Sequence, residues 1–403
     1  MNELAESTLA EVCSLVTDGT HDTPKRVVSG FPLVKAKEIT GGRIDFESCD
    51  QISEEEHLEV VARSKPEFGD TLFAHIGASL GEAAFVNTTR AFSIKNVALF
   101  KPNPSVINPR YLYYLVTSPA FQALAKATKT GSAQPFLGLS QLRGHRIQYH
   151  RDLATQRSIA AILSAYDELI EISQRRIRIL ESMARALYRE WFVHFGFPGH
   201  ETHPRIASLL GDIPEGWESV PLATLVDFAK GRKPSEARKE ALPGDVPLLL
   251  IDTLRGGEPE FTSPAKLVLA EKRDTIMVMD GASSCDVAIG FDGAVGSTLG
   301  RFRTTRPESF SPHALYRFLE AKAEEFKSKN IGAAIPHANK DYIQTQMIAV
   351  PPAAIASRFH DQLEPLQGTI ETLKGQVQNL RRTRDLLLPR LLSGKTNFAT
   401  AAI

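Results

Sequence analysis

The sequence contains only three cysteines, no long hydrophobic run and no recognisable secretion signal. Cys13, Cys49 and Cys285 lie far apart and belong to no CxxC or Cys/His cluster, which argues against a disulfide framework and a structural zinc site. No window approaches the roughly 18 consecutive apolar residues that cross a bilayer. The opening residues MNELAESTLAEV lack the basic and then apolar pattern of a signal peptide. We therefore expect reduced thiols, a cytoplasmic location and no membrane partner.

The chain also lacks an excess of charge of either sign. Its 47 basic and 47 acidic side chains give a formal net charge of +0. Because non-specific affinity for nucleic acid comes from Lys and Arg neutralising phosphates, this balance argues against a protein that coats DNA on its own. It leaves open a specific DNA-binding protein with segregated charges, or one that works beside other subunits.

Familiar catalytic motifs are missing as well. The sequence has no HExxH and no grouping of carboxylates and lysine typical of a nuclease. The GKT of residues 394–396 resembles the end of a phosphate-binding loop, but Pro389 stands where that loop needs glycine and a predicted helix precedes it. NPRY, residues 108–111, is similar to the NPPY of adenine methyltransferases, yet it has Arg110 at the third position and opens a predicted helix. The sequence therefore predicts a non-catalytic chain without catalytic, cofactor-binding or metal-binding residues.

What the sequence does contain is a repeat. At 403 residues the chain exceeds what one hydrophobic core usually supports, so two domains or a duplicated unit are expected. GSAQPFLGLSQL, residues 131–142, has a counterpart in GAAIPHANKDYI, residues 332–343. Three further pairs follow the same order along the chain: GDTLFAHIGAS with RDTIMVMDGAS, NPRYLYYLV with SPHALYRFL, and LAEVCSLVTDG with LATLVDFAKG. Self-similarity of this kind predicts a duplicated fold.

Each half ends in a long helical pattern. In the second half, apolar side chains with one polar interruption alternate at spacings of four and three, which is typical of a coiled-coil seam: Phe359, Leu363, Leu366, Ile370, Leu373, Val377, Leu380, Arg384, Leu387 and Leu391. In the first half a broader apolar stripe is expected: Ile159, Ile162, Tyr166, Leu169, Leu180, Met183 and Leu187. A helix over residues 155–193 would be about 58 Å long, and burying each Leu-sized side chain contributes about 1.5 to 3 kcal/mol. We expect the two helices to pair antiparallel; the alternative is that each packs as a surface helix on its own domain.

Polar, glycine-punctuated loops recur at matched places in both halves. DGTHDTPKR (18–26) pairs with KGRKPSEARK (230–239), and GASLG (77–81) pairs with GASSC (281–285). Such loops bring backbone N–H groups, hydroxyls and cations to phosphates, while Gln, His, Asn and Arg can read base edges in the major groove. Each loop alone is equally typical of a solvated turn. The candidate DNA-contacting residues are Thr20, His21, Thr23, Lys25, Lys35, Lys37, Ser79, Ser132, Gln134, Lys230, Arg232, Lys233, Arg255, Ser283, Ser284, His337, Asn339 and Lys340.

Two further groups allow more than one interpretation. Arginines gather toward the ends of both predicted helices: Arg175, Arg176, Arg178, Arg185 and Arg189, then Arg381, Arg382, Arg384 and Arg390. They either complement the helix dipole or contact phosphates or an acidic partner. An aromatic group stands where the first helix ends: Tyr188, Trp191, Phe192, Phe195 and Phe197. Core packing is the main expectation for this group, and docking of another subunit is the alternative.

These motifs together resemble a known family. The turns GSAQPF and GAAIPHANK, the helix openings TQRSIAAILSAYDELIE and ASRFHDQLEPLQGTIE, and IPEGWESVPLATL (213–225) are similar to those of the specificity subunit of type I restriction-modification enzymes. The resemblance covers essentially the whole chain. The first copy departs slightly, because it lacks the Gly-Trp opening and has Gly138 and Leu139 in place of a more polar pair.

The resemblance implies an α+β fold in which two pseudo-twofold-related α/β target recognition domains are joined by two long helices in an antiparallel coiled coil. The expected segments are 1–153 and 194–353 for the recognition domains, 154–193 and 354–394 for the helical spacers, and 395–403 for the tail. It further implies a DNA-binding subunit that reads a bipartite, asymmetric target in double-stranded DNA.

The same resemblance implies partner subunits. Two methyltransferase subunits would dock on the chain, and motor-nuclease subunits would complete the complex. S-adenosylmethionine, ATP and Mg²⁺ would then belong to those partners, and this chain would hold no cofactor. Two alternatives remain: a single-chain DNA methyltransferase or nuclease fused to recognition modules, and a coiled-coil scaffold that does not bind DNA.

Overall fold

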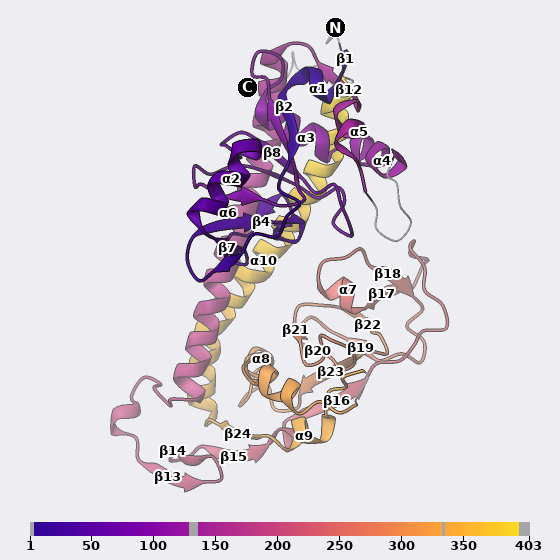
Figure 1. The fold of residues 1–403 in the computed structure, drawn as a ribbon. Helices are drawn as coiled ribbons and strands as arrows, with labels where there is room; N and C mark the ends of the chain where they lie inside the picture. The colour runs from indigo at the N-terminus through magenta and orange to yellow at the C-terminus, as the bar shows by residue number, and fades with distance from the viewer. Residues whose placement is uncertain (1–3, 129–135, 333–334, 395–403) are drawn as a thin grey trace. The chain divides into compact units, whose positions relative to one another are not determined.

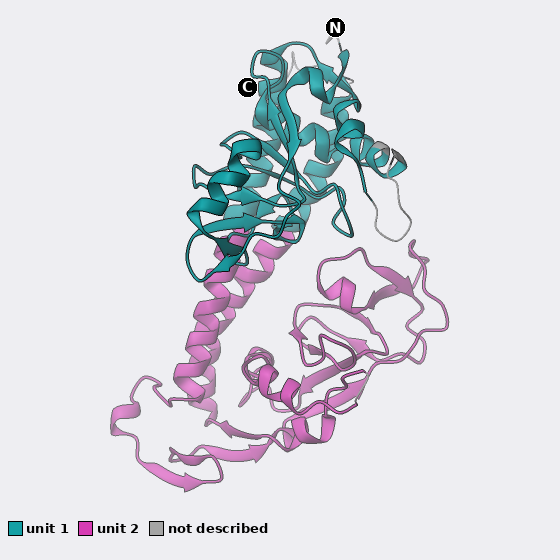
Figure 2. Cartoon of the chain, viewed as in Figure 1, with its two compact units in different colours: residues 1–172, 377–403 teal, residues 173–376 magenta. Residues whose placement is uncertain are grey.

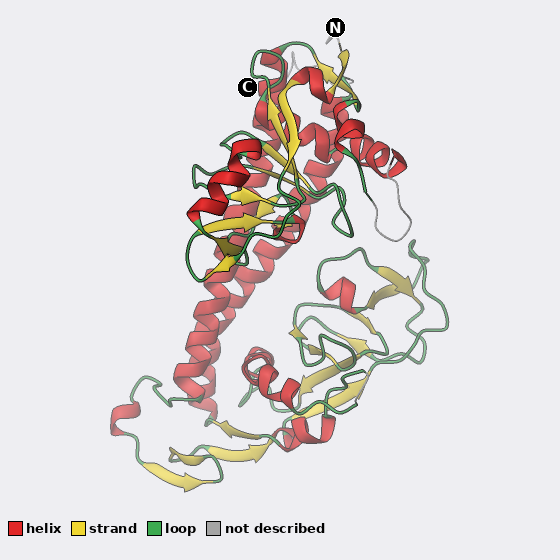
Figure 3. Ribbon diagram, viewed as in Figure 1, coloured by secondary structure: helices red, strands yellow, loops and turns green. Residues whose placement is uncertain are grey.

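The computed structural model describes residues 4–128, 136–332 and 335–394 (Figure 1). The chain divides into two compact units, residues Met1–Ile172 with Val377–Ile403 as unit 1 and residues Ser173–Gln376 as unit 2 (Figure 2). Both units combine helices and strands, and the two long helices α6 (Leu153–Phe192) and α10 (Ala353–Leu392) each contribute to both (Figure 3). The described part of the chain contains no helix that is long and apolar enough to cross a membrane.

Unit 1 is built on two four-stranded sheets. The first has the antiparallel order β2-β11-β8-β9, and the second has the order β10-β4-β7-β3, in which β10 and β4 are parallel. The pairs β1-β12 and β5-β6 are separate. The strands are β1 (Leu4–Thr8), β2 (Cys13–Asp18), β3 (Arg26–Val27), β4 (Phe31–Val34), β5 (Ile39–Thr40), β6 (Arg43–Ile44), β7 (Asp50–Ile52), β8 (Thr71–Phe73), β9 (Ala83–Phe85), β10 (Ser93–Ile94), β11 (Ala98–Pro102) and β12 (Arg146–His150).

The shorter helices of unit 1 start where the sequence places capping residues. The side chain of Asn108 accepts a hydrogen bond from the backbone N–H of Tyr111 at 3.0 Å, and Pro109 occupies the first turn of α3. NPRY is therefore a helix start, as predicted. The helices are α1 (Leu9–Val12), α2 (Glu54–Ser64), α3 (Pro109–Thr117), α4 (Pro119–Thr128) and α5 (Leu139–Arg143), with a 3-10 turn at Ala36–Glu38.

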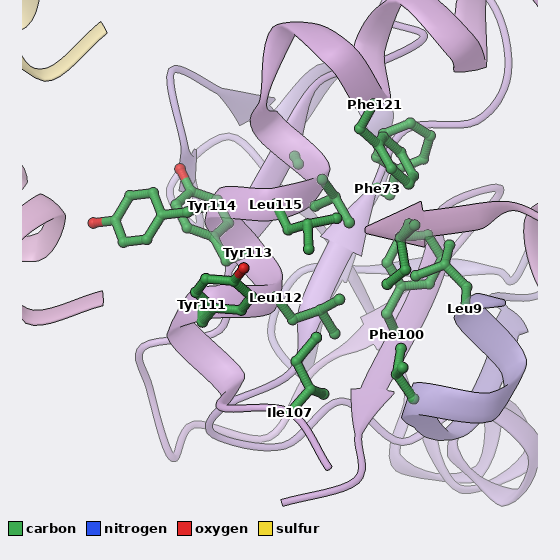
Figure 4. Close-up of a cluster of buried hydrophobic side chains, with 14 of the residues drawn as sticks. Leu9, Phe73, Phe100, Ile107, Tyr111, Leu112, Tyr113, Tyr114, Leu115 and Phe121 are labelled. Carbon is green, nitrogen blue, oxygen red and sulfur yellow. The ribbon is translucent and has the colours of Figure 1, made fainter. Parts of the chain in front are cut away.

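The core of unit 1 lies between its first sheet and α3. Tyr111, Leu112 and Leu115 of α3 join Phe73 and Phe100 of the sheet in one buried cluster (Figure 4). The cluster buries both faces of α3, which explains why its sequence is apolar over consecutive positions instead of at helical spacing only.

Unit 2 repeats this framework. Its antiparallel sheet has the order β16-β23-β20-β21, and its second sheet, β18-β17-β22-β19, again contains one parallel pair, β17 with β22. The pairs β13-β14 and β15-β24 are separate. The strands are β13 (Arg205–Ser208), β14 (Gly211–Pro214), β15 (Glu218–Pro221), β16 (Val226–Lys230), β17 (Val246–Leu249), β18 (Glu260–Thr262), β19 (Leu269–Ala270), β20 (Thr275–Val278), β21 (Val287–Ala288), β22 (Gly293–Val295), β23 (Leu299–Thr304) and β24 (Met347–Val350).

The helices of unit 2 match those of unit 1 at the aligned positions. Pro312 begins α8 behind the capping side chain of Ser311, as Pro109 begins α3 behind Asn108. The shorter helices are α7 (Ile251–Leu254), α8 (Pro312–Ser328) and α9 (Lys340–Thr345), with 3-10 turns at His200–Thr202 and Leu222–Thr224. Tyr188, Trp191, Phe192 and Phe197 are buried in the core of this unit, which confirms core packing for the aromatic group.

The long helices pack against each other within each unit. In unit 1, Ile159 and Leu163 of α6 lie in the same buried cluster as Leu388 and Leu391 of α10. Arg384, the polar interruption of the predicted seam, donates to Asp167 at 2.7 Å.

In unit 2, Tyr188 and Ala184 of α6 lie in one cluster with Phe359 and Leu363 of α10, and Lys374 pairs with Glu181 at 3.0 Å. Later residues of α6 therefore meet earlier residues of α10. The pairing is antiparallel, and the alternative of two separate surface helices is wrong. The predicted fold class is confirmed: α+β, with two α/β units joined by two long helices.

The predicted apolar stripe of the first helix was wrong in part. Leu169 is 52% exposed and Met183 is 49% exposed, whereas Leu163 and Ile170 are buried. The helix carries apolar residues on more than one face, and the partner helix selects which face is covered. A stripe of apolar residues consequently remains on the outer face of α6.

Candidate nucleic-acid interface

In each unit, the first two candidate loops leave the antiparallel sheet at the same edge. The loop of residues 18–26 follows β2, and the GASLG turn follows β8. Both strands are antiparallel to β11, which lies between them, so they run parallel to each other and end at one edge. In unit 2 the same relation holds for β16 and β20 around β23.

The first loop of each unit begins with a glycine that the packing requires. A Cβ added at Gly19 would lie 2.0 Å from the carbonyl oxygen of Ile94, and one added at Gly231 would lie 2.1 Å from that of Gly296. Such distances are impossible without moving backbone. The loops are therefore tied to a neighbouring strand connection in both units.

The glycine turns have the same hydrogen bonds in both units. The backbone N–H of Leu80 donates to the carbonyl of Gly77 at 3.1 Å, and that of Ser284 donates to Gly281 at 2.9 Å. Gly81 and Cys285 occupy the same position with φ of 102° and 70°. The copies differ here, because unit 2 holds a left-handed conformation with a residue other than glycine.

The third loop joins the other two. Ile76, just before the first glycine turn, forms an isolated β-bridge with Phe136, and Asp280 forms the equivalent bridge with His337. The backbone N–H of Ala338 donates to Met279 at 2.7 Å. Phe136, from GSAQPF, and His337, from GAAIPHANK, thus hold equivalent places in the same three-loop arrangement. Ser132 and Gln134 lie outside the described residues.

In unit 2 the three loops bring charged side chains together. Lys230 donates to both carboxylate oxygens of Asp280, at 3.0 and 2.8 Å, and Nδ1 of His337 lies 2.7 Å from Asp280 Oδ1. Burial alone would raise the pKa of Asp280, but the hydrogen bonds from Lys230 and His337 outweigh it and hold the pKa below its ordinary value. Asp280 is therefore an ionised anchor for two candidate residues.

The other predicted residues of unit 2 lie in different surroundings. Arg232 and Lys233 are exposed, and Lys340 lies over the ring of Phe228, 5.0 Å from its centroid. Ser283 is half-buried in the glycine turn, and Arg255 pairs with Asp286 at 3.4 Å.

Two candidates in unit 2 mainly support the fold. The side chain of Asn339 caps α9 by accepting from the backbone N–H of Tyr342 at 3.1 Å. Ser284 is only 2% exposed, and its hydroxyl accepts from the Asn330 amide at 2.6 Å. The serine side chain therefore braces the glycine turn and does not lie on the surface.

In unit 1 the same frame carries different side chains. Asp18, aligned with Lys230, is buried and bonded to Arg63, and it lies 3.0 Å from Nε2 of His21. Nδ1 of His21 lies 2.7 Å from the side-chain oxygen of Asn96. Ile76 and Phe136 stand where unit 2 has Asp280 and His337, and Phe136 is 39% exposed.

The remaining predicted residues of unit 1 are spread over its surface. Thr20 accepts from the backbone N–H of Asp22 at 3.1 Å, and Thr23 accepts a hydrogen bond from Lys95. Lys25 and Lys37 are exposed, while Ser79 is half-buried in the glycine turn. Lys35 is half-buried and pairs with Asp50, so its charge is already partnered within the unit.

Sequence reasoning missed three residues that organise these loops: Arg63, Asn96 and Asp280. Arg63 comes from α2 and Asn96 from the β10–β11 connection, and no local pattern marks either of them. Asp280 did carry a signal, because the aligned repeat places an acid there where the other copy has Ile76. A change from apolar to charged at an otherwise matched position is the clue that could have found it.

The cysteines lie inside the units and away from one another. Cys13, Cys49 and Cys285 are free and buried. Burial raises the pKa of Cys13 to about 12, and burial with nearby carboxylates raises that of Cys49 to about 12. Within residues 4–128, 136–332 and 335–394, no three His, Cys, Asp or Glu side chains are grouped so that they could hold a metal ion.

Comparison with known proteins gives one consistent result. The family model of the type I restriction modification DNA specificity domain matches residues 1–182 and 214–382. The type I restriction enzyme MjaIX specificity subunit of Methanocaldococcus jannaschii is 23% identical over 388 residues, covering 90% of this chain and 89% of the relative. The type I restriction enzyme HindI specificity subunit of Haemophilus influenzae is 23% identical over 420 residues, covering 86% and 90%. A crystal structure of the S subunit of a type I restriction-modification system from M. genitalium has a TM-score of 0.62 at 14% identity and covers 97% of this chain and 96% of that one, which shows a shared fold.

Proposed function

The chain belongs to the family of type I restriction modification DNA specificity domains, and we propose that it reads a bipartite, asymmetric DNA target, one part with each unit. The observation that carries this proposal is a three-loop arrangement that occurs twice with different side chains. A loop that has to touch a particular base needs a fixed backbone and a variable side chain. The matched glycines and β-bridges fix the backbone, and the exchange of Phe136 for His337 varies the side chain.

The chemistry of the two loop clusters supports two unlike half-sites. The cluster of unit 2 offers His337, Lys230 and nearby cations, which suit base edges and phosphates in the major groove. The cluster of unit 1 offers Phe136, which is 39% exposed and whose ring lies 5.8 Å from that of His75, so an apolar contact, such as one to a thymine methyl group, is available there. Because the two side-chain sets differ, we expect them to favour different bases. The target is therefore asymmetric.

We propose further that the paired helices set the spacing between the half-sites. Each helix has 40 residues, which corresponds to about 60 Å at 1.5 Å per residue. The antiparallel pairing is held by buried side chains and by the ion pairs Arg384 with Asp167 and Lys374 with Glu181. A rod of this kind favours one separation, on the order of one helical turn of DNA, about 34 Å, or somewhat more. The proposed segments remain 1–153, 154–193, 194–353 and 354–394.

Partner subunits would supply the chemistry. Four apolar side chains on the outer face of α6, two in each unit, are about half exposed: Leu169, Ile172, Ile179 and Met183. Their spacing is that of a second coiled-coil seam, which favours the docking of a helix from another chain. We propose that two methyltransferase subunits and motor-nuclease subunits assemble on this chain in the cytoplasm. S-adenosylmethionine, ATP and Mg²⁺ would then be held by those subunits, and this chain would be non-catalytic.

The proposal is tested by selection from random duplexes. The chain, purified with its methyltransferase subunits, is expected to enrich one motif made of two short, unlike elements at a fixed spacing, at stated salt. Replacing residues 1–150 with the corresponding segment of a relative should change only one element. No enriched motif, or a change in both elements, would contradict the proposal.

The enzymatic alternative needs its own experiment. The purified chain alone would be incubated with radiolabelled S-adenosylmethionine and duplexes that contain the selected motif. We expect no methyl transfer to DNA until the methyltransferase subunits are added. Transfer by the chain alone would favour the single-chain methyltransferase instead.

A further inference from the structure

His337 is held in one orientation by the loops around it. Its backbone exchanges hydrogen bonds with Ile331, at 2.8 and 2.9 Å, and Nδ1 of its ring lies 2.7 Å from Asp280 Oδ1. The side chain is nevertheless 46% exposed. The ring is thus fixed through one nitrogen while a large part of it faces solvent.

Asp280 decides which nitrogen of His337 carries the proton. An ionised carboxylate only accepts hydrogen bonds, and Lys230 only donates them. Because Lys230 contacts both oxygens of Asp280 and the carboxylate stays ionised, the ring nitrogen facing it, Nδ1, must be the donor. In the neutral imidazole this leaves Nε2 with an unshared electron pair.

We propose that His337 is a base-reading residue of unit 2, and that its Nε2 accepts a hydrogen bond from the exocyclic amino group of adenine or cytosine in the major groove. Asp280 is the positioning residue that fixes the ring and its tautomer. The inference rests on the proposed function and deepens it. Adenine N6 and cytosine N4 are the two amino donors that the major groove presents, so a hydrogen-bond acceptor distinguishes them from the oxygens of guanine and thymine.

The surroundings of His337 fit this role. Arg232 and Lys233 are exposed cations of the first loop, and Lys340 follows His337 by three residues. Cations beside a reading side chain contact phosphates and hold the register of the protein on the duplex. In unit 1 the equivalent positions are Ile76 and Phe136. The amino-group reading is therefore expected in only one of the two half-sites.

Asp280→Asn gives a sharp test because it should invert the tautomer. Lys230 would take the amide oxygen, and the amide NH₂ would then face Nδ1 of His337 and donate to it. Nε2 would carry the hydrogen and become a donor. The full complex with Asp280→Asn should exchange a preference for A or C at one position of one strand for a preference for G or T, by roughly tenfold.

His337→Ala identifies that position. It should abolish base preference at one position of one half-site, while the other positions keep theirs. Asp227→Asn is the matched control. Asp227 lies in the same sheet and pairs with Arg301, and the substitution neutralises a carboxylate that is 57% exposed. Its selected motif should equal that of the wild type, and thermal unfolding followed by circular dichroism should verify that all variants fold.

A second measurement uses modified bases at the position so identified. Replacing adenine by purine, or cytosine by pyrimidin-2-one, removes the amino group alone. Wild-type binding should weaken by roughly tenfold, and binding by His337→Ala should not respond. The inference is overturned if the wild type prefers G or T there, if His337→Ala alters no position, or if Asp280→Asn keeps the wild-type preference. A wild-type complex that selects no motif at all would instead overturn the proposed function.

Discussion

Leu373 offers the most direct test of the helix pairing. Its side chain is 3% exposed in α10. Leu373→Ala removes three carbon atoms from the buried seam, and at about 0.8 kcal/mol for each the transfer loss is about 2.4 kcal/mol. The cavity left behind raises the expected loss in free energy of unfolding to about 3 to 4 kcal/mol.

Leu386 is the matched control for this substitution. It lies on the same helix, but its side chain is 55% exposed. Leu386→Ala should change the free energy of unfolding by about 0.5 kcal/mol or less. Urea unfolding followed by circular dichroism gives both values, and hydrogen exchange of the α10 amides places the loss on the helices. Equal effects of the two substitutions would refute a seam buried between the helices.

The same position also tests the proposed spacing role. Leu373→Asp places a carboxylate in the seam, so it should weaken the pairing further and broaden the range of spacer lengths that the complex tolerates. Assembly with the partner subunits has to be measured in parallel. An intact complex that keeps one spacer length would show that the helices do not set it.

The remaining predictions concern two glycines, one buried threonine and four buried histidines. Gly231→Ala should destabilise unit 2 and abolish reading of one half-site, because the added Cβ would lie 2.1 Å from a backbone oxygen. Gly375→Ala should instead stabilise α10 by about 1 kcal/mol, because a Cβ there would have nothing within 4 Å. Urea unfolding and duplex selection measure both substitutions. Thr275→Val should raise the free energy of unfolding by about 1 kcal/mol in the same assay, since the buried hydroxyl has no hydrogen-bond partner among the described residues. Burial lowers the pKa of four histidines below the ordinary 6.5: His57, His75, His145 and His313. Because the unfolded chain therefore binds protons at a higher pH than the folded chain, the urea midpoint should fall as the pH drops below about 6.5. The midpoint of His145→Phe should fall less.

The sequence predicted the framework because the framework is written twice. Paired glycines, paired prolines at helix starts and paired apolar strands each had a second copy that separated signal from chance, as Pro109 with Pro312 illustrates. The long helices were predictable from their periodicity. The buried face of α6 could not be predicted, because Leu163 and Leu169 are chemically alike and only the packing against the partner helix distinguishes them.

The loops of the candidate interface were predicted, but the contacts among their side chains were not. Loop membership follows from position in the repeat, so Lys230 and His337 could be named in advance. Lys230 and His337 both contact Asp280, although they lie 50 and 57 positions away from it along the chain. This shared contact depends on the sheet order, which brings the segments together. Ser284 was misjudged for a related reason: a turn has an inner and an outer side, and the serine hydroxyl faces inward to Asn330.

The anchoring of basic side chains by buried or partly buried carboxylates is also consistent with the neutral net charge of the chain. Each loop cluster contains one shielded carboxylate, Asp18 in unit 1 and Asp280 in unit 2, and each of these holds a basic side chain from a different segment. A long basic side chain that is fixed before binding loses less conformational entropy when it meets DNA. The acid lowers the net charge of the surface, so it weakens binding to arbitrary duplexes, which depends on phosphate neutralisation. Contacts to particular bases are kept, and the balance shifts from affinity toward specificity. A neutral chain with acid-anchored cations is therefore suited to reading sequence, and we propose that partner subunits supply much of the phosphate contact.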